Sequence, residues 1–320
     1  MNTEVSNGSA LKRRVRAVIV NHNTSDLTQA CVRSLKLQEY SPLDLVVVDD
    51  NSKPSEAEKL HGLASLGVTL ILSKRSTGYA RSLNAGARAR WLPKPTFVLG
   101  LNSDIELRDS HTVEKLIGCL DASSRRVAVS PIVNNVRVHG CPHSEVQVRR
   151  VPNVFQTIIL HSWWLRRVMD VSKRLTSWYT YAEHRPYNPS VTVECETING
   201  ACFMVRSDFL KKVGYLDEGT FLYMEELILG AQIKGEDKTA CLATDTTVDH
   251  LQGQSTGFTI SQFRGRMYVE QVRSEVHFVR TYHGAGWTST GLLVGVRAID
   301  AGGKIIAGAI RRLVSMPGQG

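Results

Sequence analysis

Residues 43–56 read LDLVVVDDNSKPSE, an apolar run that ends in two aspartates, an asparagine and a serine. The run from Leu45 to Val48 is continuous and rich in β-branched valine, which is typical of a strand buried on both faces of a parallel sheet. The polar residues after it then form a loop at the carboxyl end of the strand, where open α/β sheets place their ligands. This stretch therefore predicts the fold class and the edge of the sheet that holds the site.

The first 130 residues repeat the same alternation of strand and helix patterns. Strands are predicted within 15–23, 45–48, 67–73 and 95–106, and helices within 24–38, 54–66 and 78–91. Thr24 or Ser25 is a candidate cap for the first helix. Strands that alternate with helices pair in parallel through right-handed crossovers, so their polar loops project from one edge of the sheet.

Composition bounds the class of protein. With 320 residues, 42% of them apolar, the chain is long enough to bury a full core. A formal net charge of +9 favours anionic partners: nucleic acid, an acidic membrane face or phosphorylated small molecules. The six cysteines are scattered without metal-binding spacing, and no apolar leader opens the chain, which indicates free thiols in a reducing cytoplasm. No apolar run reaches the roughly 20 residues of a membrane span.

The polar loops allow a structural and a functional interpretation. Asp49, Asp50, Asn51 and Ser52 could simply cap the helix that begins near Ser55, and the LNSDIE stretch could be a plain turn. However, two acidic loops on alternate strand-helix units suit a divalent cation and a phosphate ligand. The glycine motifs GxGxxG and GxxxxGK[ST] are absent, which counts against NAD and ATP as ligands.

Residues 16–257 resemble the inverting nucleotide-sugar glycosyltransferases of family 2, and within them the bacterial rhamnosyltransferase-like group. The resemblance rests on motifs in the family order: VIVNHNTSDLTQACVRSL, VVVDDNS, TGYARSLNAG, LGLNSDIE, NGACFMVRSDFLKKVGYLDEGTFLYMEE and VDHLQGQSTG. It implies a GT-A type α/β fold: a Rossmann-like, mostly parallel sheet flanked by helices, with a helical insertion and C-terminal helices.

The resemblance also implies roles for the loop residues. Asp50 would accept a hydrogen bond from the imide of uracil or thymine, while backbone near Asn23 closes over the base. Asp104 would bind Mn²⁺ or Mg²⁺, and His250 would be a second ligand or a phosphate contact. Four further nucleotide-binding residues are implied: Asn51, Gly78, Asn84 and Asn102.

The catalytic position departs from the family pattern. The family has a Glu-Asp pair whose aspartate removes the proton of the acceptor hydroxyl, and this chain has Glu225 and Glu226. Glu226 would be the base, because base catalysis depends on hydrogen-bond reach and glutamate is only one methylene longer. Ile228 and Ala231 stand where the family has an aspartate and an arginine. A slow enzyme, a shifted donor or acceptor preference, or a relative that only binds sugar nucleotides therefore remains open.

The remaining segments combine aromatic, basic and apolar residues. Residues 136–196 hold Trp163, Trp164 and Trp178 among arginines and lysines, which suits a helical flap on the sheet, a membrane interface or stacked nucleic-acid bases. A helix within 258–284 is expected to turn four apolar residues toward the core: Phe263, Met267, Val272 and Val276. After Gly302 and Gly303, a short basic amphipathic helix predicts at most peripheral membrane association.

Five segments are predicted: a basic leader (1–14), a nucleotide-sugar-binding half (15–135), the insertion (136–196), an acceptor-side catalytic segment (197–258) and C-terminal helices (259–320). The predicted protein is a cytoplasmic transferase, at the inner face of the membrane if it associates peripherally. It moves a hexose or deoxyhexose from a UDP- or dTDP-sugar to a lipid-linked or glycan acceptor in cell-surface glycan assembly. The alternatives are a non-catalytic sugar-nucleotide-binding relative and, ranked last, a nucleic-acid-binding protein; no nucleic-acid partner is expected.

Overall fold

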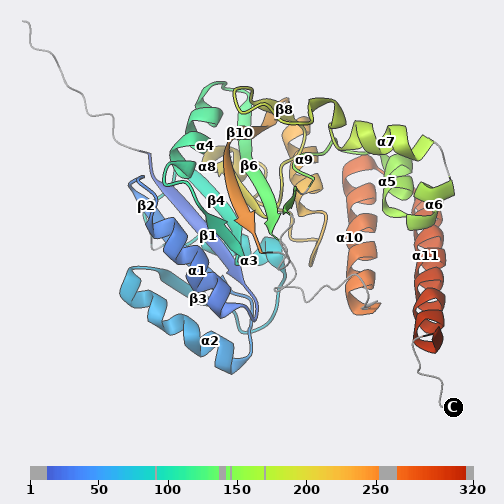
Figure 1. The fold of residues 1–320 in the computed structure, drawn as a ribbon, viewed down its shortest axis with the longest axis horizontal. Coiled ribbons are helices and arrows are strands. Elements are labelled where there is room, and N and C mark those ends of the chain that lie inside the picture. Colours follow the sequence, from blue (N-terminus) through green and yellow to red (C-terminus); the bar gives the residue numbers. More distant parts are fainter. Residues whose placement is uncertain are drawn as a thin grey trace, which may run out of the picture.

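The computed structural model describes residues 13–90, 92–136, 142–144, 146–168, 171–251 and 265–314. Within these residues, ten strands form one mixed sheet with the order β3-β2-β1-β4-β9-β6-β10-β5, while β7 pairs with β6 and β8 with β10. Figure 1 shows this sheet between layers of helices, with a separate group of helices at one end.

The sheet elements have the following bounds: β1 Val15–Asn21, β2 Leu43–Asp49, β3 Thr69–Leu72, β4 Phe97–Asn102, β5 Ile105–Leu107, β6 Arg126–Val136, β7 Pro142–Ser144, β8 Val193–Cys195, β9 Cys202–Arg206 and β10 Thr239–His250. The helices are α1 Ser25–Lys36, α2 Pro54–Leu60, α3 Tyr79–Ala87, α4 Thr112–Asp121, α5 Val154–His161, α6 Trp163–Val168, α7 Val171–Tyr179, α8 Ser207–Lys212, α9 Glu225–Gly235, α10 Gly265–His283 and α11 Trp287–Val314. Two 3₁₀ turns, η1 His61–Leu66 and η2 Ala182–His184, complete the set.

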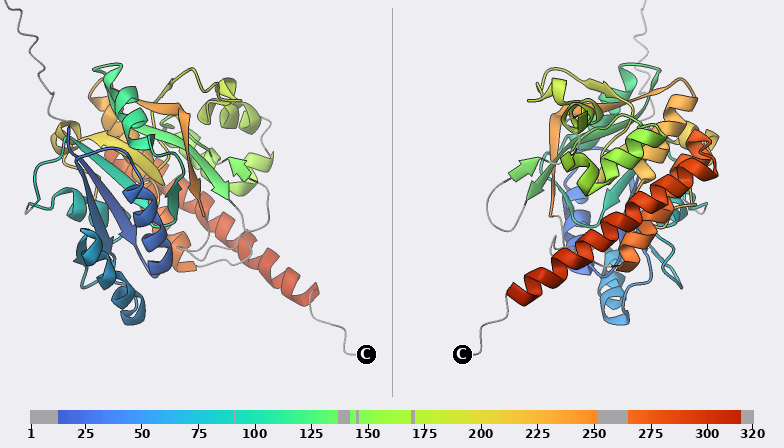
Figure 2. Two further views of the ribbon diagram at one scale, coloured as in Figure 1. Left: turned by 60° about the vertical axis from the view of Figure 1, so that its left-hand side comes forward. Right: turned by 90° about the vertical axis from the view of Figure 1, so that its right-hand side faces the viewer.

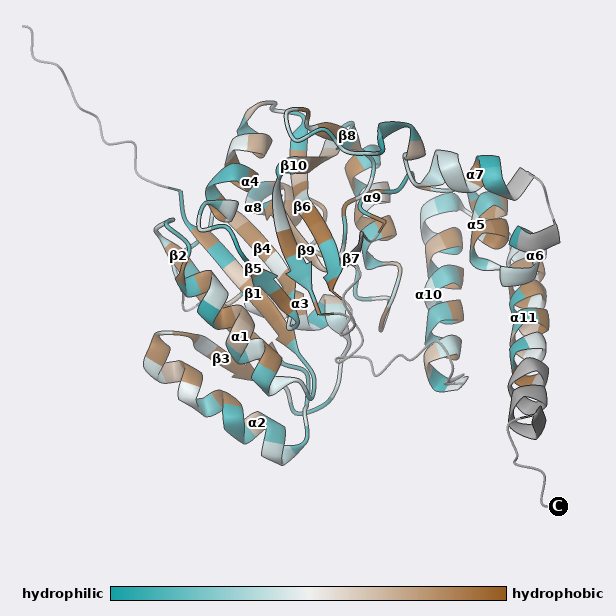
Figure 3. Cartoon of the chain, in the orientation of Figure 1, coloured by the Kyte–Doolittle hydropathy of each residue, from teal (hydrophilic) through white to brown (hydrophobic). Residues whose placement is uncertain are grey.

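The predicted parallel core is confirmed. Strands β3, β2, β1 and β4 are neighbours and all run parallel, with Asn21 of β1 opposite Asp49 of β2. Val46, Val47 and Val48 are fully buried, since α1, α2 and α4 cover one face of the sheet and α3, α8 and α9 cover the other. Figure 3 shows the apolar strands between these helices. The antiparallel strand β9 follows β4 and brings in the second half of the sheet.

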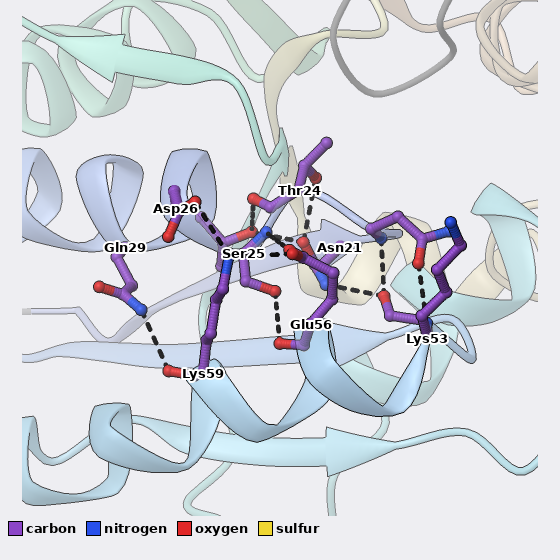
Figure 4. Close-up of polar contacts among 11 residues, drawn as sticks. Asn21, Thr24, Ser25, Asp26, Gln29, Lys53, Glu56 and Lys59 are labelled. Atoms are coloured by element: carbon purple, nitrogen blue, oxygen red, sulfur yellow. Dashed lines mark hydrogen bonds and ion pairs between the residues drawn. The ribbon is translucent and has the colours of Figure 1, made fainter.

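The cap of α1 differs from the prediction. Neither Thr24 nor Ser25 caps the helix with its side chain. Instead Glu56 of α2 accepts a hydrogen bond from the Ser25 backbone N–H at 3.1 Å, and its own carbonyl accepts from Ser25 Oγ at 2.6 Å (Figure 4). A carboxylate from a neighbouring helix thus satisfies a free amide at the start of α1.

The helices α5, α6, α7, α10 and α11 form a second layer against α9 (Figures 1 and 2). The prediction of a short helix that begins after Gly302 and Gly303 is wrong, because α11 runs from Trp287 to Val314 through both glycines. Gly303 is required by packing: a Cβ there would lie 2.9 Å from the Trp163 ring. None of the helices in the described residues is long and apolar enough to cross a membrane.

The predicted inward face of α10 is also shifted. Its buried residues are Ser274, Glu275, Phe278 and Val279. Val272 and Val276 are partly buried and pack against the cluster that contains Phe278, as predicted, whereas Met267 is only partly buried and Phe263 lies outside the described residues. The helix is rotated because α10 packs against the loop before α9 and against α11 rather than against the sheet. The division of the chain into five segments remains a prediction.

Candidate functional site

The carboxyl ends of β1 and β2 are joined by a buried polar network. Asn21 Nδ2 donates to Asp49 Oδ1 at 2.6 Å and to Ser52 Oγ at 3.1 Å. Ser52 Oγ also accepts from the Asn23 backbone N–H at 2.7 Å. Because Lys53 is the N-cap residue of α2 and makes no side-chain cap, the acidic loop does not serve to cap that helix. The capping interpretation of Asp49 and Ser52 is therefore wrong.

Asp50 is 5% exposed and lies between the β2 loop and the start of α3. Its carboxylate accepts hydrogen bonds from Ser76 Oγ at 2.7 Å, from the Thr77 backbone N–H at 2.7 Å and from Ser82 Oγ at 3.1 Å. The Gly78 backbone N–H donates to it at 3.2 Å. Asp50 thus fixes the turn before α3, where a carboxylate is favoured at a helix N-terminus. Its predicted contact with a nucleotide base remains a prediction.

The glycine at position 78 is required by the backbone. Gly78 has φ +90°, and a Cβ there would lie 2.1 Å from the Phe221 carbonyl oxygen. The next residue, Tyr79, donates its backbone N–H to the same carbonyl at 3.2 Å. The predicted nucleotide-binding loop therefore contacts the segment that leads into α9.

The amides predicted to bind nucleotide lie in different surroundings. Asn23 and Asn51 both adopt left-handed backbone angles at the sheet edge, and Asn23 Oδ1 accepts from the Lys53 backbone N–H at 2.8 Å. Asn84 is fully buried, where its amide donates to the Leu216 carbonyl and accepts from the Leu216 backbone N–H. Asn84 therefore has a structural role in holding the loop after α8, and the structure does not bring its side chain to the edge loops.

Asp104 and His250 meet at the end of the sheet. Asp104 follows β4, and the antiparallel pairing of β5 with β10 sets His250 opposite Ile105. His250 Nε2 lies 3.2 Å from Asp104 Oδ1, and both side chains are buried. Within the described part of the chain, neither carboxylate oxygen of Asp104 receives a hydrogen bond. The predicted pair is thus together in space; residues 252–257 of its motif lie outside the described residues.

A divalent cation fits this pair. A buried carboxylate without hydrogen-bond donors carries a large desolvation cost, which a cation would relieve. Carboxylate oxygen and imidazole nitrogen both suit Mn²⁺. No group of three or more His, Cys, Asp or Glu side chains gathers into a metal site among the described residues. Two protein ligands would leave the other coordination positions to a phosphate ligand and water.

The acidic pair opens α9. Glu225 makes a long contact with Thr220 Oγ1 at 3.4 Å, and burial, followed by the charge of Glu226, raises the pKa of its carboxyl to about 8. Burial, followed by Glu225, also raises the pKa of the Tyr79 hydroxyl, which donates to the Gly200 carbonyl at 3.2 Å. At neutral pH Glu225 therefore holds a proton.

Arg149 supports Glu226 and was not identified from the sequence. Its Nη1 lies 3.0 Å from Glu226 Oε1, and each side chain is about one-quarter exposed. Arg149 is itself held by Thr197, whose Oγ1 accepts from the Arg149 backbone N–H at 2.9 Å. The sequence carries no signal for this pair, because Arg149 and Glu226 are 77 residues apart in the chain.

One turn, at Gly200 and Ala201, lies between the candidate metal site at Asp104 and the acidic pair of α9. The Asn102 backbone N–H donates to the Ala201 carbonyl at 2.9 Å, which places the β4 end beside this turn. A Cβ added to the adjacent Gly200 would lie 3.7 Å from Glu226 Oε2. The predicted Asp104, Asn102 and Glu226 thus surround one region, to which the Gly78 turn is joined through Phe221.

The sequence profile described as Glycosyl transferase family 2 matches residues 17–214. The chain belongs to glycosyl transferase family 2. The match begins within β1, includes β2 to β4 and the loops that hold Asp50 and Asp104, and ends before α9. A search of curated proteins finds no significant match.

Solved structures share the fold of this glycosyltransferase. GalNAc-T7 with UDP, GalNAc and Mn²⁺ has a TM-score of 0.61 at 16% identity, covering 85% of this chain and 48% of its own. The mannosyltransferase PcManGT from Pyrobaculum calidifontis, with GDP-Man and Mn²⁺, has a TM-score of 0.53 at 15% identity, covering 96% and 77%. S. aureus TarS 1-349 with UDP has a TM-score of 0.50 at 12% identity, covering 88% and 70%. The chain spans about half the length of the GalNAc-T7 chain, and the GT-A type fold class is confirmed.

Proposed function

We propose that this glycosyltransferase is metal-dependent and inverting, and that it moves a hexose or deoxyhexose from a nucleotide diphosphate sugar to an acceptor hydroxyl. The observation that carries the proposal is the buried Asp104 carboxylate, which has His250 at 3.2 Å and no hydrogen-bond donor among the described residues. Glu226 lies near the same region through the turn at Gly200. A cation site and a base on one sheet edge are what such a transfer requires.

In this proposal Asp104 and His250 hold Mn²⁺ or Mg²⁺. The cation would supply charge neutralisation for the leaving nucleoside diphosphate. The protein's own contribution is a dry site: Asp104 is 1% and His250 5% exposed, so their interaction with a charged ligand is screened only weakly by water. GalNAc-T7 and the mannosyltransferase were both solved with Mn²⁺, which supports this choice of metal.

Glu226 is proposed as the general base. It would take the proton of the acceptor hydroxyl as that oxygen attacks the anomeric carbon from the face opposite the diphosphate, which inverts the anomer. Arg149 Nη1 lies 3.0 Å from Glu226 Oε1 and restricts the orientation of this carboxylate. Glu225 is the weaker candidate, because its raised pKa keeps it protonated at neutral pH.

The donor nucleotide is proposed to lie over the β1 and β2 loops. This edge is bordered by Asn23, Asn51 and the turn at Gly78. Asp50 fixes that turn by accepting a hydrogen bond from the Gly78 backbone N–H. A pyrimidine imide would reach Asp50 only by replacing one of its present donors, for example Ser76 Oγ. We propose a UDP- or dTDP-linked donor. More specifically, we propose that the sugar is a deoxyhexose, as the resemblance to the rhamnosyltransferase-like group implies. UDP in the TarS structure supports a uracil base, whereas the mannosyltransferase binds GDP-Man.

The proposed pathway is cell-surface glycan assembly in the cytoplasm, with a lipid-linked or glycan acceptor at the inner face of the membrane. The net charge of +9 supports an encounter with an anionic lipid surface. The second candidate is a relative that binds sugar nucleotides without transfer. It is favoured by the surroundings of the acidic pair, where Ile228 is 1% exposed in an apolar cluster.

The proposal is tested by incubating the purified protein with UDP-, dTDP- and GDP-sugars, with Mn²⁺ or Mg²⁺, and with a crude lipid acceptor fraction. Release of nucleoside diphosphate from one donor, abolished by EDTA, is expected, and NMR of the product should show an inverted anomer. Tight donor binding without release under any acceptor would instead support the binding-only relative.

A further inference from the structure

The outward face of α11 is apolar over a long distance. The side chains on this face include Trp287, which is 80% exposed, Ile299 at 61% and Ile305 at 56%. Leu292 and Val294 are also about half exposed, and small residues lie between them. Figure 2 shows α11 as a long helix that extends past the rest of the chain. At about 1.5 Å per residue, the stretch from Trp287 to Ile305 gives a face roughly 27 Å long.

The described carboxylates of α10 and α11 are all paired with arginines. Arg297 is buried between Glu275 and Asp300, at 3.0 Å and 3.2 Å, and all three are at most 3% exposed. Glu270 is paired with Arg273 at 2.8 Å. Among the side chains that the structure describes on these two helices, the other exposed charges are basic, at Arg266, Arg280 and Lys304. An apolar face that is bordered by cations and has no free carboxylate among its described residues is complementary to an anionic apolar surface.

A groove of about 630 Å³ between α10 and α11 adjoins this face. Val272, Val276 and Val294 provide its apolar lining, and Arg280 provides a cation beside Arg273, which is paired with Glu270. The Arg280 guanidinium lies 4.5 Å from the Trp287 ring centroid, so the groove and the exposed face are continuous. Aromatic and arginine side chains in contact are suited to the headgroup region of a bilayer.

These two helices also contact the proposed catalytic segment. Ser274 Oγ donates to the Leu222 carbonyl at 2.9 Å, and His277 Nε2 lies 2.9 Å from Asp217 Oδ2. Both partners belong to the loop that leads directly into Glu225. A surface bound by α10 and α11 would therefore lie next to the acceptor side of the site.

We propose that the outward face of α11, together with the groove between α10 and α11, binds the surface of a bilayer that contains anionic phospholipid. The inference rests on the proposed function in one respect: it would bring a lipid-borne acceptor hydroxyl to Glu226. A second copy of the chain is a poorer occupant, because two such faces would bring like charges at Arg280 and Lys304 together.

The test is vesicle flotation, which needs neither donor nor acceptor and therefore does not depend on the transferase activity. Vesicles of phosphatidylcholine alone are compared with vesicles containing one-third phosphatidylglycerol. Wild type should float with the anionic vesicles, and the variant Trp287→Gln/Ile299→Gln/Ile305→Gln should lose on the order of tenfold or more in affinity. Glutamine is a good helix former, so α11 should persist. In Arg280→Gln/Lys304→Gln, affinity should fall roughly fivefold for each removed charge.

The matched apolar control is Leu37→Gln/Leu66→Gln, because these leucines are 71% and 47% exposed at the nucleotide-binding half. Arg33→Gln on α1 is the matched charge control. Both controls should float like wild type. Equal flotation of the α11 variant, or no flotation of wild type, would overturn the proposal. So would a concentration-dependent dimer in analytical ultracentrifugation that disappears in the α11 variant, which would assign the face to a second copy.

Discussion

Arg149 and Glu226 form an ion pair with 3.0 Å between Nη1 and Oε1, although they lie on segments far apart in the sequence. The pair is partly exposed, so its net contribution to stability is small. Its consequence is geometric, because a guanidinium restricts the orientation of the carboxylate that it contacts. In the proposed mechanism, this orientation directs Glu226 toward the acceptor hydroxyl.

Arg149→Met should lower kcat by on the order of tenfold to a hundredfold, because the base loses its fixed orientation. The Kd for the donor should stay unchanged, since Arg149 contacts the proposed general base Glu226 and not the loops proposed to bind the nucleotide. Arg149→Lys should restore part of kcat. The matched control is Arg150→Met, because Arg150 pairs with Glu183 and not with Glu226. Equal losses in the two methionine variants would contradict the assigned role.

Glu225 should make stability depend on pH. Its pKa is raised to about 8, so between about pH 4.5 and pH 8 the folded protein keeps a proton that the unfolded chain has released. Stability therefore falls as pH rises through this window. Glu225→Gln lacks this titrating group, so its free energy of unfolding should fall less than that of wild type as pH rises. From pH 5.5 to pH 8.5 the difference between the variant and wild type should shift by roughly 1–3 kcal/mol in favour of the variant.

Urea denaturation at the two pH values measures this difference. Glu58→Gln is the control, because Glu58 is exposed on α2. The control should follow wild type at both pH values. A difference between Glu225→Gln and wild type that is the same at pH 5.5 and pH 8.5 would refute the assigned protonation.

The metal prediction concerns Asp104 and His250. Calorimetric titration of Mn²⁺ in the presence of UDP should show affinity at least tenfold weaker in Asp104→Asn, because the amide removes the charge that balances the cation. His250→Gln should have a smaller effect. Asp109→Asn serves as the control, since Asp109 is paired with Lys115 outside the site. Unchanged Mn²⁺ affinity in Asp104→Asn would exclude the proposed ligand.

The parallel core was predictable because the residues that indicate each strand are neighbours in the sequence. The Leu45–Val48 run and the loops after it indicate a buried strand and its carboxyl end without any knowledge of distant contacts. By contrast, Gly302 and Gly303 suggest the start of a new helix, whereas both lie inside α11. Gly303 lies inside a helix to make room for Trp163, a contact that no local pattern contains.

The site was predictable only in part, for the same reason. Asp104 and Glu226 follow from motifs, whereas the contact of Asp104 with His250 depends on antiparallel pairing of β5 with the last residues of β10. Asn84 matches a motif position, yet its amide is used for the Leu216 backbone. Arg149 reaches Glu226 through its attachment to Thr197, and nothing near Arg149 in the sequence indicates it.

Gly78 should tolerate no side chain. Gly78→Ala places a Cβ 2.1 Å from the Phe221 carbonyl and forces a left-handed residue, so we expect a loss of roughly 2–4 kcal/mol in the free energy of unfolding. Gly62→Ala is the control, because a Cβ there meets nothing within 4 Å. Thermal denaturation of both variants measures the difference, and Gly62→Ala should be neutral or slightly stabilising. A Gly78→Ala protein as stable as wild type would mean that the turn relaxes freely.

The most direct test is metal-dependent release of nucleoside diphosphate by wild type, Glu226→Gln and Glu225→Gln, each with donor, Mn²⁺ and the lipid acceptor fraction. We expect Glu226→Gln to lower kcat by about 10²- to 10⁴-fold with donor binding retained. Glu225→Gln should keep most of the activity at neutral pH, because Glu225 is already protonated there. Full activity in Glu226→Gln, or loss of activity in Glu225→Gln alone, would contradict Glu226 as the base of this glycosyltransferase.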